Sequence, residues 1–196
     1  MTLIYMRDTN FIVTLKQGGV GVMPTDTIYG LVASAFDKKA VLRVYKLKKR
    51  SSGKPFIILI SDVSELAMFG VDTDNNLKKV LRKIWRGQVS VVLPCPNIKK
   101  ELSYLKPKDK TLAFRCPKDK WLRDFLRETG PIIAPTANPE GAPPAQTIKQ
   151  AKAYFNDKVD FYWDKGELKA EPSTLISFEN GKVKVLRQGA VKITNF

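Results

Sequence analysis

The sequence contains no histidine among its 196 residues. Without histidine the chain cannot form a Ser-His-Asp triad, a histidine metal site or a histidine general base. Cysteine is scarce as well, because only Cys95 and Cys116 are present, and each lies beside a proline after an apolar stretch. Their spacing excludes a Cys-x-x-Cys motif and favours two buried thiols. Chemistry in this protein therefore depends on Lys, Arg, hydroxyls, carboxylates, backbone dipoles and a metal carried by a substrate.

Long apolar runs are also missing from the chain. No stretch approaches the roughly 20 residues that span a bilayer, and residues 1–11 include Arg7, Asp8 and Asn10 in place of a signal-peptide core. We therefore expect a cytoplasmic protein with no membrane partner. Hydrophobic residues still make up 43% of the chain, which is enough for a core. The length predicts a single domain over residues 1–196.

Positive charge is what the sequence has in excess. Lys and Arg total 34 against 19 Asp and Glu, so the formal net charge is +15. Such an excess predicts a polyanionic partner, which could be a nucleotide, a nucleic acid or an anionic membrane face. A lysine-rich, solvated surface is the simpler alternative, because charge alone identifies no partner.

The pattern of apolar residues predicts an α/β fold. Strands alternate with helices over much of the chain, and Asn180-Gly181 predicts a hairpin near its end. We expect a twisted mixed sheet, largely parallel with antiparallel parts, with flanking helices. The strands are expected at 20–23, 56–60, 88–93, 111–115, 132–134, 159–163, 173–178 and 182–187. The helices are expected at 8–17, 37–48, 62–68 and 75–86, around 121–126, and after Thr147, whereas the lysine-rich stretch 97–110 is expected to be a loop.

Polar residues follow the expected strands at six places, often directly after a proline. Thr25, Asp26, Thr27 and Tyr29 form the first cluster, which is either a small-molecule site or a turn that satisfies only its own backbone. Lys48, Arg50 and Lys54 form the second, at a helix end and a strand entrance. These cations can converge on a phosphate, although a helix C-terminus attracts cations in any case.

The third cluster is Arg115, which needs an anionic partner among apolar neighbours, either a ligand or a structural carboxylate. Thr111 lies on the same face of the same strand by the two-residue period. Thr136 and Asn138 lie two apart in a proline-rich loop, so they can point the same way. The remaining clusters are Ser173-Thr174 at the start of a strand and 187–189 at the end of one. In α/β sheets ligands gather where strands end.

Taken in order, these segments resemble the YrdC-like family of threonylcarbamoyl-AMP synthases. The resemblance runs from about residue 10 to 191. The matching segments are PTDTIYGL at 24–31, Lys48-x-Arg50 with Lys54-Pro55, TLAFRCP at 111–117, PTANPEGAPP at 135–144, PSTLI at 172–176 and LRQG at 186–189.

The resemblance implies a twisted α/β fold with a deep basic cavity. It also implies synthesis of L-threonylcarbamoyladenylate and pyrophosphate from L-threonine, bicarbonate and ATP, for N6-threonylcarbamoyladenosine in certain tRNAs. Partners would then include tRNA or the machinery that transfers the threonylcarbamoyl group. The positions implied for threonine are Thr27, Arg115, Thr136 and Ser173. Those implied for ATP are Arg50, Lys54, Thr111, Asn138 and Arg187, with Lys48 and Arg50 as the catalytic pair that neutralises anions.

The cofactor expectation is ATP as a substrate, with Mg²⁺ carried by the nucleotide and no metal held by the protein, because no carboxylate cluster resembles a dedicated cage. Three departures from the family pattern concern substrate contacts: Thr136 replaces the usual serine, and Glu140 and Gln146 stand where the family has hydroxyls. Two alternatives stay open at this point. One is a non-catalytic module that binds double-stranded RNA or tRNA in the same cavity. The other is a carbamoyl transferase acting on another acceptor.

Overall fold

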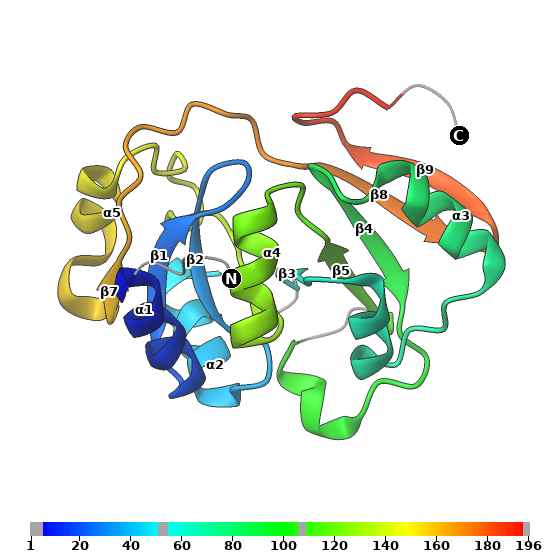
Figure 1. Ribbon diagram of the computed structural model, residues 1–196, viewed down its shortest axis with the longest axis horizontal. Coiled ribbons are helices and arrows are strands. Elements are labelled where there is room, and N and C mark those ends of the chain that lie inside the picture. Colours follow the sequence, from blue (N-terminus) through cyan, green and yellow to red (C-terminus); the bar gives the residue numbers. More distant parts are fainter. Residues whose placement is uncertain (1–5, 51–54, 106–108, 194–196) are drawn as a thin grey trace.

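The computed structural model describes residues 6–50, 55–105 and 109–193. Within that part, nine strands form one sheet in the order β7-β1-β2-β6-β3-β5-β4-β8-β9. The strands are β1 Val20–Pro24, β2 Tyr29–Ser34, β3 Ile57–Leu59, β4 Val89–Pro94, β5 Thr111–Arg115, β6 Ile132–Ile133, β7 Phe161–Tyr162, β8 Thr174–Glu179 and β9 Lys182–Arg187. The sheet extends across the molecule, with β7 and α5 at one end and β9 and α3 at the other (Figure 1).

Five α-helices and three 3₁₀ helices surround the sheet in the described part of the chain. The α-helices are α1 Met6–Lys16, α2 Lys38–Lys48, α3 Asn75–Ile84, α4 Lys120–Thr129 and α5 Ile148–Phe155. The 3₁₀ helices are η1 Val63–Phe69, η2 Lys100–Leu105 and η3 Asn156–Lys158. Four of the α-helices begin at a side-chain cap, at Asp37, Asp74, Asp119 and Thr147 respectively. Short polar residues at these positions accept from the free amides of the first turn, so they define where the helices start.

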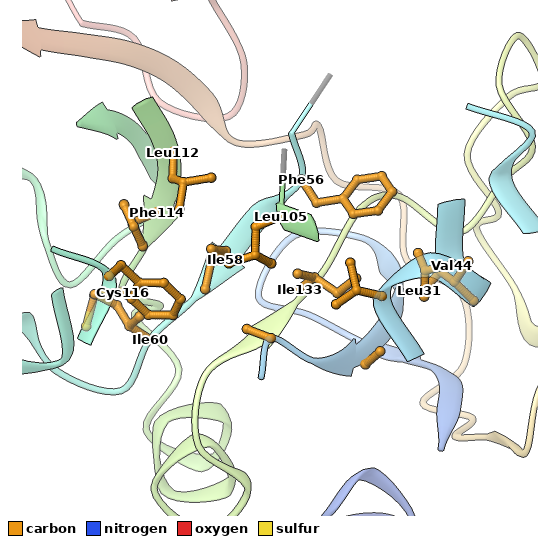
Figure 2. Close-up of a cluster of buried hydrophobic side chains, with 14 of the residues drawn as sticks. Leu31, Val44, Phe56, Ile58, Ile60, Leu105, Leu112, Phe114, Cys116 and Ile133 are labelled. Atoms are coloured by element: carbon orange, nitrogen blue, oxygen red, sulfur yellow. The ribbon is translucent and has the colours of Figure 1, made fainter. Parts of the chain in front are cut away.

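Two apolar clusters occupy opposite faces of the sheet. Consecutive strand residues contribute to different clusters, as Ile58 and Leu59 do, because successive side chains of a strand point to opposite faces. α1 and α4 pack over the face that carries Leu59. The other face carries Ile58 and is covered in part by α2 and η2. Figure 2 shows this second cluster, with Leu31, Ile58 and Phe114 from separate strands in one layer.

The mixed α/β sheet is confirmed, but its expected parallel majority is wrong. Of the eight strand pairings in the described chain, five are antiparallel and three are parallel. The main reason is β2, which the sequence analysis did not predict. Only residues 25–28 separate β1 from β2, and a connection that short can join only antiparallel neighbours.

The stretch 97–110 is not simply the loop that was predicted. Residues 100–105 form η2, and Leu102, Tyr104 and Leu105 are buried. The Tyr104 hydroxyl donates a 3.0 Å hydrogen bond to the carbonyl of Ala35. A 3₁₀ helix repeats every three residues, so Leu102 and Leu105 share a face without the period of an α-helix. That short period explains why no helical pattern was recognised.

Candidate functional site

A cavity of about 330 Å³ opens where the ends of several strands meet. Its walls come from the β1–β2 turn, the chain after α2, the start of β3, the middle of β5, the segment after β6 and the β8–β9 hairpin. The residues that line it are Thr25, Thr27, Ile28, Tyr29, Gly30, Arg50, Pro55, Phe56, Ile57, Val92, Ala113, Arg115, Ala134, Pro135, Thr136, Pro172, Ser173, Leu175 and Arg187. The lining combines hydroxyls, guanidinium groups and apolar surface.

The β1–β2 turn has a geometry set by Thr25. Both its backbone amide and its hydroxyl donate to the carbonyl of Ile28, at 3.1 and 2.6 Å. Its hydroxyl also lies 3.2 Å from that of Thr27, which is buried and faces the cavity. A Cβ at Gly30 would lie 3.0 Å from the Thr25 side chain, so glycine allows the turn to pack closely on β2. The turn satisfies its own backbone and still presents Thr27 to the cavity.

Arg115 at the end of β5 is held by a carboxylate from that turn. Its guanidinium lies 2.9 Å from Asp26 Oδ1, and it donates a 3.4 Å hydrogen bond to the hydroxyl of Thr27. Both charged side chains are almost completely buried. Burial raises the pKa of Asp26, opposed by the charge of Arg115, and burial lowers the pKa of Arg115, opposed by Asp26. The structural carboxylate is therefore present, while Arg115 Nε has no hydrogen-bond partner among the described residues.

Ser173 lies beside the cavity at the start of β8, and other elements hold it there. Its hydroxyl is 2.8 Å from that of Ser90 on β4, and both residues are buried. Its carbonyl accepts a 2.8 Å hydrogen bond from Arg187 at the end of β9. A Cβ at Gly189 would lie 2.2 Å from the Pro172 carbonyl oxygen, so the chain after β9 passes very close to this segment. The hairpin thus brings a hydroxyl and a guanidinium to one wall.

Arg50 and Arg187 give the cavity its positive potential together with Arg115. The Arg50 guanidinium carbon lies 5.3 Å from the centre of the Phe56 ring, a cation–π contact. Its buried Nε has no hydrogen-bond partner in the described part of the chain. The pKa of Arg187 is lowered, first by partial burial and then by the charge of Arg50. Two guanidinium groups that repel each other in a cavity favour an anion between them.

The loop after β6 forms another wall. The Leu31 amide donates to the Pro135 carbonyl at 2.8 Å, and the Ala137 amide donates to the Tyr29 carbonyl at 2.9 Å. These bonds align the loop with β2 and place the Thr136 hydroxyl at the cavity. Asn138 faces its own loop instead, because its amide nitrogen donates to the carbonyls of Pro139 and Ala142, at 3.0 and 2.6 Å.

Lys48 at the end of α2 is buried behind this loop. Its ammonium donates to the carbonyls of Thr136 and Asn138, at 2.6 and 2.7 Å, and to Asn138 Oδ1 at 3.2 Å. Its backbone carbonyl accepts a 2.7 Å bond from the Glu140 amide. Burial lowers the pKa of Lys48 to about 8; Arg50 lowers it further and Glu140 opposes the shift. Lys48 is therefore part of the loop's internal structure.

The structure thus brings most of the predicted site residues to one cavity. Thr27, Arg50, Arg115, Thr136, Ser173 and Arg187 line it, although they come from distant parts of the chain. Lys48 and Asn138 contact the Thr136 loop and do not line the cavity. Thr111 is on β5 but is absent from the lining, and Lys54 lies outside the described residues.

Sequence reasoning missed the residues that support the site from behind. Ser90 contacts the hydroxyl of Ser173, and Gln88 donates a 2.5 Å hydrogen bond to the Asp26 carbonyl. Phe56, whose ring contacts Arg50, was predicted only as a strand residue. A serine inside the apolar run 89–93 was the one available signal, since a buried hydroxyl needs a partner.

Two searches of the described residues found nothing. No helix there is long and apolar enough to cross a membrane. Over the same ranges, no group of three or more Cys, Asp or Glu side chains could hold a metal ion. The cavity offers three guanidinium groups and several hydroxyls, so the groups on its walls can bind carboxylate and phosphate.

Comparison with known proteins agrees with this lining. A family model named Sua5_yciO_yrdC, described as telomere recombination, matches residues 13–189. A Mycobacterium tuberculosis protein is 31% identical over 179 residues, which are 90% of this chain and 81% of that protein. The Bacillus subtilis threonylcarbamoyl-AMP synthase is 29% identical over 185 residues, which cover 90% of this chain and 51% of that enzyme.

Solved structures show the same architecture. The crystal structure of P. abyssi Sua5 complexed with L-threonine superposes with a TM-score of 0.82 at 26% identity, over 93% of this chain and 54% of that one. This chain therefore spans about half the length of that protein. E. coli YciO has a TM-score of 0.83 at 24% identity, over 95% of this chain and 90% of that one, which shows a shared fold.

Proposed function

Because the chain belongs to the Sua5/YciO/YrdC family, we propose that it is an L-threonylcarbamoyladenylate synthase, a nucleotidyltransferase. Its substrates would be L-threonine, bicarbonate and ATP, and its products the adenylate and pyrophosphate. The observation that carries the proposal is the convergence of Thr27, Arg115 and Ser173 with Arg50 and Arg187 in one cavity. The name of the Bacillus subtilis relative and the L-threonine complex of P. abyssi Sua5 support it.

The cavity lining suggests a place for each substrate. Arg115, Thr27 and Ser173 form a cluster of one guanidinium and two hydroxyls, which suits the carboxylate and hydroxyl of threonine. Thr136 completes this proposed threonine set. Arg50, Arg187, Asn138, Thr111 and Lys54 are the proposed ATP residues. Of these, Arg50 and Arg187 line the cavity, and Asn138 would act through the shape of its loop.

The proposed reaction needs no protein nucleophile. The threonine amine and bicarbonate form a carbamate with loss of water. A carbamate oxygen then forms a bond to the α-phosphorus of ATP, while the bond between that phosphorus and the bridging oxygen breaks and pyrophosphate leaves. Arg50 and Arg187 would stabilise the negative charge, and positioning would supply much of the remaining rate. Mg²⁺ would enter as part of the nucleotide substrate.

The product would then serve the N6-threonylcarbamoyladenosine modification of tRNA. We propose tRNA or the threonylcarbamoyl-transfer machinery as the downstream partner. The net charge of +15 is compatible with either, because the arginines of the cavity account for only a small part of it.

A single assay tests the proposal. The protein is incubated with ATP, Mg²⁺, bicarbonate and each amino acid in turn, and pyrophosphate and the adenylate are measured. We expect pyrophosphate release that requires both threonine and bicarbonate. Arg50→Ala should reduce it at least a hundredfold, whereas the exposed Lys46→Ala on the same helix should not. Absence of turnover together with tight, salt-sensitive RNA binding would instead support the RNA-binding module.

A further inference from the structure

Lys48 has an unusual environment for a lysine. Its side chain is buried at the end of α2, with 2% of the residue exposed. Its ammonium is surrounded by three oxygens of the 135–144 loop at 2.6 to 3.2 Å, and all three are neutral. No carboxylate lies within ion-pair distance of it among the described residues. Three hydrogen bonds satisfy the donors of this ammonium, but its charge has no counterion.

The bonds of Lys48 join two elements that both border the cavity. Its ammonium contacts Thr136, which lines the cavity, and its carbonyl accepts from the amide of Glu140 farther along the loop. Arg50, two residues after Lys48, reaches the cavity directly. Neutral carbonyl oxygens do not screen a charge as a carboxylate would, so the ammonium adds positive potential to the wall formed by Thr136.

We propose that Lys48 is a positioning residue, which holds the 135–144 loop in the shape that receives the ATP phosphates and whose uncompensated charge is neutralised by the bound nucleotide. This inference rests on the proposed function for the identity of the anion. It revises the expectation that Lys48 is a catalytic residue in contact with substrate. Lys48 acts through the loop, and Arg50 is the cation of the pair that faces the reactants.

Coupling of this kind makes nucleotide binding depend on protonation. The charged groups that influence Lys48 are Arg50, which lowers its pKa, and Glu140, which raises it. Burial brings the pKa of free Lys48 to about 8, and a bound polyanion must raise it. Because the protonated form attracts the anion, affinity is full below pH 8 and falls as pH rises through that value. Binding near pH 8.5 must therefore take up a proton.

Calorimetry in buffers of different ionisation enthalpy measures that proton directly. We expect uptake of roughly half a proton per ATP·Mg²⁺ at pH 8.5, and a Kd that rises about tenfold between pH 8 and pH 10. Phosphate esters complete their ionisation near pH 6, so the nucleotide does not supply this signal. Lys48→Met should remove the proton uptake and weaken ATP binding at least tenfold at pH 7. Lys48→Arg keeps a cation that does not titrate, so it should also remove the uptake.

A measurement without ligand separates positioning from direct contact. Hydrogen exchange of the Glu140 and Ala145 amides reports the loop, because these amides donate to the carbonyls of Lys48 and Ala137. We expect at least tenfold faster exchange at both in Lys48→Met, and unchanged exchange in the matched variant Lys46→Met. ATP binding by wild type without proton uptake at pH 8.5 would overturn the proposal, as would unchanged loop exchange in Lys48→Met. Neither result depends on turnover, so failure of the synthase assay is a distinct outcome.

Discussion

The most enclosed charges of the site, at the scale of single residues, are those of Asp26 and Arg115. They contact each other at 2.9 Å, with 4% and 5% of their side chains exposed. Removing two charges from water is costly, and the pair survives because each charge compensates the other. The remaining donor of Arg115, Nε, has no hydrogen-bond partner among the described residues. Asp26 therefore orients Arg115 and leaves it a free donor.

Asp26→Asn tests this pairing, because it keeps the shape of the side chain and removes its charge. The guanidinium of Arg115 would then be buried without a counterion. We expect the free energy of unfolding to fall by about 3 kcal/mol, measured by urea denaturation. The exposed Asp157→Asn is the control. A loss at Asp26 no larger than that at Asp157 would show that the pair contributes nothing net to stability.

α2 is the element that connects stability with the site. It begins at Asp37, whose carboxylate accepts a 2.8 Å hydrogen bond from the Ala40 amide, and it ends at Lys48. Val41 and Val44 bury one face of the helix in the core. A helix anchored at its start and along one face has a defined end, so Lys48 and Arg50 emerge at a fixed position.

Asp37→Ala tests the role of the cap. It leaves an amide of the first turn without its acceptor, so we expect a loss of about 1 kcal/mol and a Tm lower by about 2–4 °C. Lys38→Ala, an exposed position in the first turn of the same helix, should change Tm much less. Differential scanning calorimetry on both variants gives the comparison. Equal shifts would mean that side-chain loss in the first turn, and not the cap, sets the effect.

The whole molecule carries a net charge of +15, and self-repulsion of such a charge opposes compactness. Most ionic side chains of the described ion pairs are at least partly exposed, and exposed pairs contribute little. The fold therefore depends on its two apolar clusters, on either side of one continuous sheet. Charge is available for partners because it is not needed to hold the core together.

Salt should therefore stabilise this protein. Raising NaCl from about 0.02 to 0.3 M shortens the Debye length from above 20 Å to below 8 Å and screens the repulsion. We expect a Tm increase of a few degrees at constant pH, followed by circular dichroism. Sucrose at equal osmolality is the control for a general solute effect. A Tm that falls with salt would indicate that attractive ion pairs outweigh the repulsion among the excess cations.

The sequence by itself determined the local structure and the chemistry that is possible. Asp37, Asp74 and Thr147 begin their helices as predicted, because a capping residue acts within its own first turn. Asn180-Gly181 joins β8 and β9 as predicted, because both residues adopt the positive φ that this hairpin needs. The lack of histidine limits the site to Lys, Arg, hydroxyls and carboxylates before any fold is known.

Only the tertiary structure decided which of those groups share a site and which support it. Lys48 and Thr136 are 88 residues apart, and so are Thr27 and Arg115, yet each pair is in hydrogen-bond contact. No local pattern specifies such contacts, because they depend on strand order: β6 lies between β2 and β3, and β4 lies beside β8. The same order buries Lys48 behind its loop and leaves Arg50 at the cavity, since a difference of two residues at a helix end changes the direction of the side chain.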